Sequence, residues 1–191
     1  MKTMTKQIFG IALMLGAFAL TTTTLSAADK KLTEAQLIAE LSGPNEDKVA
    51  NAMLQLEKNF PTSTAMLPPI KKLLTDPREK VRRKAARVLG ALHTEVDATD
   101  LKNITAMFAA KNPQEAMDAL TALRGLKAES VLPEVVAQLK SANNNLVRDA
   151  MRTISELGNK SHVSAIEPLL AHADPGVKKD AADAIFKLQK K

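Results

Sequence analysis

The stretch Leu67–Leu92, LPPIKKLLTDPREKVRRKAARVLGAL, decides the fold. Apolar residues recur in each half at the spacing of one helical face, at Leu67, Ile70, Leu73 and Leu74 and then at Val81, Ala85, Val88, Leu89 and Leu92. Between the halves, Asp76 is expected to be the N-cap of the second helix, with Pro77 as its first residue and Glu79 completing a capping box. Because neither helix can bury its apolar face alone, the pair must stack on neighbours.

The same two-helix pattern occurs five times along the chain. The repeats start at Ala35, Leu67, Leu101, Leu132 and Val163, which are 32, 34, 31 and 31 residues apart. A nearly fixed period in this range predicts an all-α fold, an α-solenoid of about five two-helix repeats at about 32–62, 63–95, 96–128, 129–159 and 160–191. A column of small residues, Ala85, Ala119, Ala150 and Ala181, is expected to be buried where the second helices approach their neighbours.

Several details of these units resemble HEAT repeats. They are the Asp-Pro turns at Asp76-Pro77 and Asp174-Pro175, with Asn112-Pro113 in the third unit, the following Val81-Arg82 and Val177-Lys178, the Ala85-Ala86 and Ala181-Ala182 pairs, and the closing Leu92 and Leu188. The sequence resembles the short-period HEAT repeats of phycobilisome-lyase-like families over roughly 32–188. Tetratricopeptide repeats have a similar period, but the Asp-Pro turns and the absence of Trp and Tyr favour HEAT repeats. The resemblance implies a protein-binding scaffold whose second helices line a concave face.

The N-terminal segment has the pattern of a secretory signal peptide. Lys2 and Lys6 precede an apolar run at 8–20, and Ser26 and Ala28 are small residues at the −3 and −1 positions of a cut before Asp29. The alternative is an uncleaved anchor, although the run is shorter than the roughly 20 residues of a membrane span. We therefore expect a signal peptide at 1–28, cleavage between Ala28 and Asp29, and a periplasmic or secreted repeat domain at 29–191 with no membrane span.

Composition argues against several kinds of active site. The chain has no cysteine and no Trp or Tyr, and it lacks the motifs of nucleophilic, phosphate-binding and zinc-protease sites. None of His93, His162 and His172 is followed by Glu, so the His-Glu pairs of HEAT-type iron hydroxylases are missing. Asp180 and Asp183 lie one turn apart, but lysines flank them, which is typical of a solvated helix face. We expect no catalytic residue, cofactor or metal.

The candidate site is a basic ridge on the second helices. Lys80, Arg83, Lys84 and Arg87 lie opposite the predicted core of the second repeat, and Arg148 and Arg152 occupy the equivalent face of the fourth. Arginine suits the capture of a carboxylate or phosphate. The competing interpretation of the same residues is a solvated, solubilising face.

These observations predict a non-enzymatic, exported scaffold that binds another protein, one with an acidic patch, through the concave face of its second helices. One alternative is a polyanion binder that uses the basic ridge for anionic lipid headgroups, acidic polysaccharide or nucleic acid. The other is a chromophore-handling or metal-dependent enzyme of HEAT type. A net charge of +6, of which two charges lie in the signal segment, is too mild to demand a polyanion. The lack of stacking aromatics argues against nucleic acid.

Overall fold

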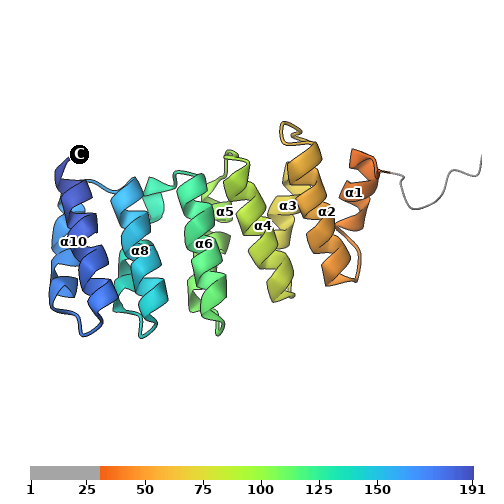
Figure 1. Ribbon diagram of the computed structural model, residues 1–191. Coiled ribbons are helices and arrows are strands. Elements are labelled where there is room, and N and C mark those ends of the chain that lie inside the picture. Colours follow the sequence, from red (N-terminus) through yellow and green to blue (C-terminus); the bar gives the residue numbers. More distant parts are fainter. Residues whose placement is uncertain (1–30) are drawn as a thin grey trace, which may run out of the picture. The chain divides into compact units, whose positions relative to one another are not determined.

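Five long helices, the second helices of the repeats, lie side by side in sequence order (Figure 1). They are α2 (Glu46–Asn59), α4 (Glu79–Ala91), α6 (Pro113–Gly125), α8 (Asn144–Leu157) and α10 (Pro175–Gln189). The computed structural model describes residues 31–191, and in this range the chain is helical with no strand. The predicted all-α solenoid of five repeats is confirmed. The predicted signal peptide and its cleavage site lie outside the described residues.

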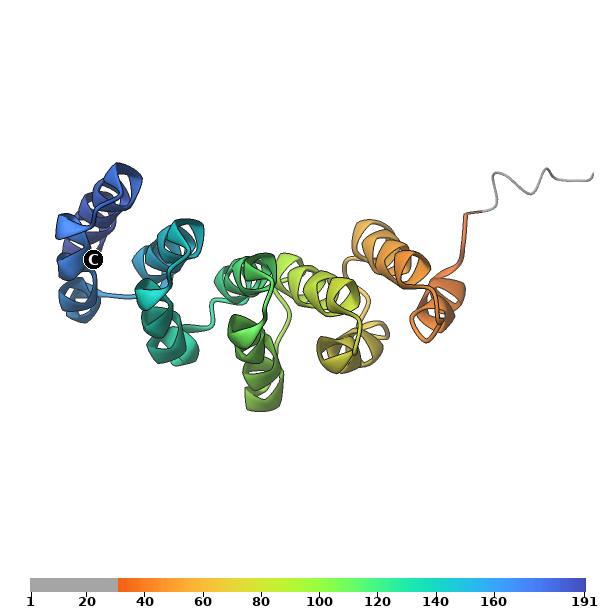
Figure 2. The same cartoon turned by 90° about the horizontal axis from the view of Figure 1, so that it is seen from below.

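The first helices are shorter and form a second row beside the long ones (Figure 2). They are α1 (Glu34–Glu40), α3 (Leu67–Lys72), α5 (Ala98–Ala106), α7 (Leu132–Ala137) and α9 (Val163–Ile166). Four of them continue as a 3-10 turn, namely η1 (Leu73–Thr75), η2 (Met107–Ala109), η4 (Gln138–Lys140) and η6 (Glu167–Ala171). Two more 3-10 turns, η3 (Glu129–Val131) and η5 (Lys160–His162), lead into α7 and α9. No helix within 31–191 has the length and apolarity needed to cross a membrane.

The helix caps agree with the Asn-Pro and Asp-Pro turns of the third and fifth repeats but not with that of the second. Asn112 and Asp174 cap α6 and α10, and a proline follows each as the first helical residue. The prediction that Asp76 caps the second helix is wrong, because α4 begins at Glu79 with Arg78 at its N-cap position. Asp76 instead accepts a 2.8 Å hydrogen bond from the Arg78 backbone N–H and binds the Arg78 guanidinium. Three residues separate the 3-10 turn from the long helix in both the second and the fifth repeat, and Asp76 is the first of them, whereas Asp174 is the last. Asp76-Pro77 is therefore not equivalent to Asp174-Pro175.

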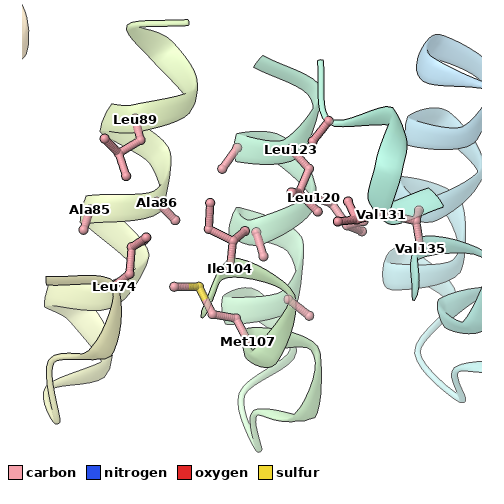
Figure 3. Packing of buried hydrophobic residues seen from close by; sticks show 14 of the residues in the cluster. Leu74, Ala85, Ala86, Leu89, Ile104, Met107, Leu120, Leu123, Val131 and Val135 are labelled. Carbon is pink, nitrogen blue, oxygen red and sulfur yellow. The ribbon is translucent and has the colours of Figure 1, made fainter. Parts of the chain in front are cut away.

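The core runs without interruption from repeat to repeat. Figure 3 shows residues of the second to fourth repeats in contact, with Leu74, Ile104 and Met107 packed between α4 and α6. All four column alanines, Ala85, Ala119, Ala150 and Ala181, are completely buried, which confirms that prediction. Each repeat therefore covers the apolar face of the next, as a solenoid requires.

Two glycines bring α4 and α6 unusually close together. A Cβ added to Gly125 would lie 2.2 Å from the Gly90 carbonyl oxygen, and one added to Gly90 would lie 2.6 Å from the Ala122 Cα. Gly125 ends α6, and its φ is not positive. The left-handed residues are His93 and Lys127, with φ of 50° and 52°. Gly125 is therefore explained by the close approach of two backbones rather than by a left-handed cap.

Candidate partner-binding surface

The structure places all six predicted ridge residues on the polar side of α4 and α8. Lys80, Arg87, Arg148 and Arg152 are exposed, whereas Arg83 and Lys84 are half-buried. They do not form one continuous group, because α6 lies between the two sets (Figure 1).

Four of the six already have acidic partners. Lys80 pairs with Asp47 of the preceding repeat, Arg83 with Asp118 of the following repeat at 2.6 Å, Arg148 with Asp180 of the following repeat at 2.6 Å, and Arg152 with Glu156 on its own helix at 3.0 Å. Three of these pairs join neighbouring repeats. Half of the predicted ridge residues therefore form ion pairs between repeats.

The acids of these ties form a column next to the buried alanines. Asp118, Asp149 and Asp180 each precede a column alanine, and each lies within 4 Å of an arginine of the preceding repeat. Their partners are Arg83, Arg124 and Arg148, in that order. In α4 the residue before Ala85 is Lys84, so a cation occupies the position that carries aspartate in the next three repeats.

Lys84 lies beside a second cation. Arg87 follows one turn later on the same helix, and neither side chain has an acid within salt-bridge distance among residues 31–191. Burial lowers the pKa of Lys84, and the positive charge of Arg87 lowers it further, whereas Glu57 and Asp118 act in the opposite direction. A carboxylate or phosphate bound here would therefore stabilise the charged form of a partly desolvated lysine. We call Lys84 and Arg87 the cation pair.

Two further buried acids, which the predicted site does not include, join the second and third repeats. Glu115 is 2% exposed and receives hydrogen bonds from Arg82 at 2.7 and 3.0 Å, and Asp100 is 6% exposed beside Lys71 at 2.7 Å. The hydrogen bond to Glu115 raises the pKa of Arg82. The alignment of Glu115 with the core residues Val81, Leu146 and Val177 is the sequence signal that could have identified it.

Side chains of α8 and α10 surround a hollow of about 280 Å³ on the same side of the array. Arg148 and Arg152 line it together with Glu156, Asp180, Asp183 and Lys187. Three bases thus face three acids, and the hollow has no excess of either charge. It is a weaker candidate than the cation pair for the capture of an anion.

The histidines make local hydrogen bonds. His93 Nδ1 lies 2.7 Å from the Gly125 carbonyl oxygen and so joins the second and third repeats. His172 Nδ1 accepts from the Asp174 N–H at 3.0 Å, and His162 Nδ1 accepts from the Asn159 N–H at 3.3 Å. Within the described residues, no three His, Asp or Glu side chains lie close enough together to hold a metal ion.

Within residues 31–191 the fold is that of a helical-repeat solenoid. The family model described as HEAT repeat matches residues 66–95, the stretch that decides the fold, and the predicted resemblance is confirmed. The chain is similar to the complex of CpcE and CpcF of phycocyanin lyase from Nostoc sp. PCC7120, with 19% identity, a TM-score of 0.70, and coverage of 87% of this chain and 68% of the other.

Designed repeat proteins are similar as well. A designed armadillo repeat protein in complex with the peptide (KR)4 has 18% identity and a TM-score of 0.61, with 80% of each chain covered. An engineered protein has 17% identity and a TM-score of 0.61, with 83% of this chain and 80% of the other covered. No curated protein sequence matches the chain. At these identities the likenesses show a shared fold.

Proposed function

We propose that this protein is a non-enzymatic scaffold that binds an acidic segment of another protein at the cation pair, Lys84 and Arg87. The observation that carries the proposal is Lys84, which occupies a position that holds aspartate in the three later repeats. Each of those aspartates pairs with an arginine of the preceding repeat, whereas Lys84 is a cation and forms no such pair. An acidic side chain from a partner would supply the missing negative charge.

The distribution of charge favours an acidic protein segment over a polyanion. Helix α4 carries five bases and one acid, whereas acids roughly balance bases on α6 and α8. A polymer with a charge at every unit would need a basic track along several repeats. The cation pair instead suits one or two carboxylates held at a defined place.

The designed armadillo protein supports the mode of binding by analogy, because that helical-repeat protein is in complex with a peptide. Its peptide, (KR)4, is basic. We expect the opposite preference here, because the unmatched charges on α4 are positive. The phycocyanin lyase complex shares the fold at 19% identity. We propose binding rather than catalysis because the distinctive feature of this surface is an unmatched cation pair.

The test is a comparison of two double charge reversals in the mature chain. Lys84→Glu with Arg87→Glu alters the cation pair. Lys178→Glu with Lys179→Glu makes the same change of charge at two exposed lysines of α10 that have no ion pair among residues 31–191. Lys190 and Lys191 are unsuitable controls, because Lys190 covers Phe186 and Lys191 donates to carbonyls of the fourth repeat.

Each variant and the wild-type protein would be used as bait in envelope extract, and the captured proteins identified by mass spectrometry. We expect an acidic partner that the wild-type protein and the α10 variant retain and the α4 variant loses. Its affinity for wild type should fall with added salt more steeply than its affinity for the α4 variant. Equal loss with both variants would show diffuse charge attraction. Binding of heparin or anionic vesicles by wild type, lost in the α4 variant, would favour the polyanion alternative.

We also propose that the protein acts outside the cytoplasm, a proposal supported by the signal-peptide pattern of residues 1–28. Protein recovered from the periplasm or medium should have the intact mass of a chain whose first residue is Asp29. A membrane-bound species that keeps residues 1–28 would favour the anchor alternative.

A further inference from the structure

A row of hollows follows the edge of the array at which first helices turn into second helices, away from the cation pair. Successive hollows lie between repeats one and two, two and three, and three and four, with volumes of about 370, 340 and 290 Å³. Thr75 lines both the first and the second, and Ala110 lines both the second and the third. Because neighbours share a wall, the three hollows form one surface, which we call the turn-edge furrow.

Equivalent positions of successive first helices build the furrow. Lys72, Ala106 and Ala137, which end α3, α5 and α7, line one hollow each. The 3-10 turns that follow supply the next lining residues, such as Leu73 and Met107. A 3-10 turn is narrower than an α-helical turn and leaves room against the adjoining repeat. The furrow therefore repeats one hollow at each of the three contacts between repeats one and four, and each hollow has both apolar and polar lining residues.

The furrow has a positive rim. Arg78 is neutralised by Asp76 at 2.7 Å, and Arg82 by Glu115. The other two bases that line it, Lys72 and Lys140, are exposed and have no acid within salt-bridge distance among residues 31–191. The lining acids are thus already paired, and a ligand meets two free lysines beside hollows that each hold apolar side chains, such as Leu73, Met107 and Phe108.

We propose that the turn-edge furrow binds an acidic peptide of a partner protein in polyproline II conformation, with an apolar side chain at every third residue. Polyproline II has three residues per turn and rises about 3.1 Å per residue, so side chains on one face recur about every 9 Å. Packed helices lie about 8–10 Å apart, so successive hollows have a matching period. Acidic residues between the apolar ones would meet Lys72 and Lys140. This is a second site, independent of the cation pair.

The probe is a fluorescent peptide of Leu-Pro-Glu repeated four times, with binding to the mature chain followed by anisotropy. The control peptide has the same composition, scrambled so that leucine never recurs at the third position. We expect the periodic peptide to bind and the scrambled one to bind at least about tenfold more weakly, since only the first can fill successive hollows. Equal binding of both peptides would overturn the proposal.

Two sets of variants locate the site. Ala106→Trp with Ala137→Trp fills two hollows from exposed positions, and we expect at least a tenfold loss, whereas Ala91→Trp, at an exposed position outside the furrow, should have no effect. Lys72→Glu with Lys140→Glu should weaken binding about fivefold without adding bulk. Lys84→Glu with Arg87→Glu should leave the peptide affinity unchanged. Loss only in that last variant would place the peptide on the cation pair and overturn the furrow.

Discussion

The contact between the second and third repeats differs from the contact between the fourth and fifth, although both use an arginine–aspartate tie at the same positions. In the first, Arg83 and Asp118 have side chains 28% and 8% exposed. In the second, Arg148 and Asp180 are 45% and 32% exposed. The N–O distance is 2.6 Å in both. The comparison teaches that the depth of burial, not the length of the ion pair, distinguishes the two contacts.

Two positions explain why the depth of burial differs. Gly90 and Gly125, five and six residues after their column alanines, let α4 and α6 touch through their backbones. The same two positions between α8 and α10 carry Ser155 and Lys187, and both side chains line the hollow of about 280 Å³. Between α6 and α8 they carry Arg124 and Glu156, which pair at 3.8 Å. These two positions therefore set how closely successive second helices approach.

The largest expected effect is the loss of a buried tie. Arg82→Ala would leave Glu115, 2% exposed, without its charged partner, and we expect a loss of about 3 kcal/mol of unfolding free energy, because an uncompensated buried charge is costly. The measurement is urea unfolding followed by circular dichroism. Adding Glu115→Val, which matches Val81 and Val177 in the other repeats, should restore most of the loss. If the double variant is no more stable than Arg82→Ala, burial of Glu115 is not the cause.

A smaller loss is expected from forcing α4 and α6 apart. In a helix, Gly→Ala normally gains up to about 1 kcal/mol. At Gly125, however, the new methyl group would lie 2.2 Å from a backbone oxygen that cannot rotate away. Overpacking should win, and we expect Gly125→Ala to cost about 1–3 kcal/mol in urea unfolding. Lys187→Ala at the equivalent position of α10 is the control and should be nearly neutral. A stabilising Gly125→Ala would contradict the close approach.

The exposed tie should have little effect when it is removed. Arg148→Ala breaks the pair with Asp180, in which both side chains are well exposed, and we expect a change below about 1 kcal/mol in urea unfolding. The matching change, Arg83→Ala, should cost clearly more, because it leaves Asp118 buried beside α4. Equal losses would show that burial does not separate the two contacts.

The repeat fold could be predicted from the sequence, whereas the pairing of charges could not. Apolar spacing around Ile70, Val81 and Leu89 gives the helices directly, because that spacing reflects a local period. The start of α4 was misplaced because Asp76 binds Arg78 instead of capping the helix. Lys80, Arg83 and Arg148 each pair with an acid about one repeat away, and a helix pattern does not say which acid such a residue meets. One feature of the charges can be read from the sequence alone. When the repeats are aligned, Lys84 occupies the position that holds Asp118, Asp149 and Asp180 in the next three repeats.

The smallest expected effect concerns the contact between the third and fourth repeats, which lies between the two extremes. Asp149 occupies the aspartate column, yet its pair with Arg124 is long, at 3.6 Å. Burial raises the pKa of Asp149, while Arg124 and Arg152 act to lower it. The folded state therefore holds this proton more tightly than the unfolded state does. The contribution of Asp149 to stability falls as pH rises from the ordinary value of 3.8 through the raised pKa.

Asp149→Asn should accordingly be more stable than wild type at pH 7, by less than about 1 kcal/mol. The difference should shrink as pH falls through the raised pKa of Asp149 toward 3.8, where the wild-type carboxyl is protonated in both states. Urea unfolding at pH 7 and pH 4 gives the comparison. Asp118→Asn is the matched change at the buried tie and should have the opposite sign at pH 7, because Arg83 lies 2.6 Å from that carboxylate. If Asp149→Asn also destabilises the protein at pH 7, the pair with Arg124 outweighs the cost of burying Asp149. The contact between the third and fourth repeats would then resemble the buried Arg83–Asp118 contact.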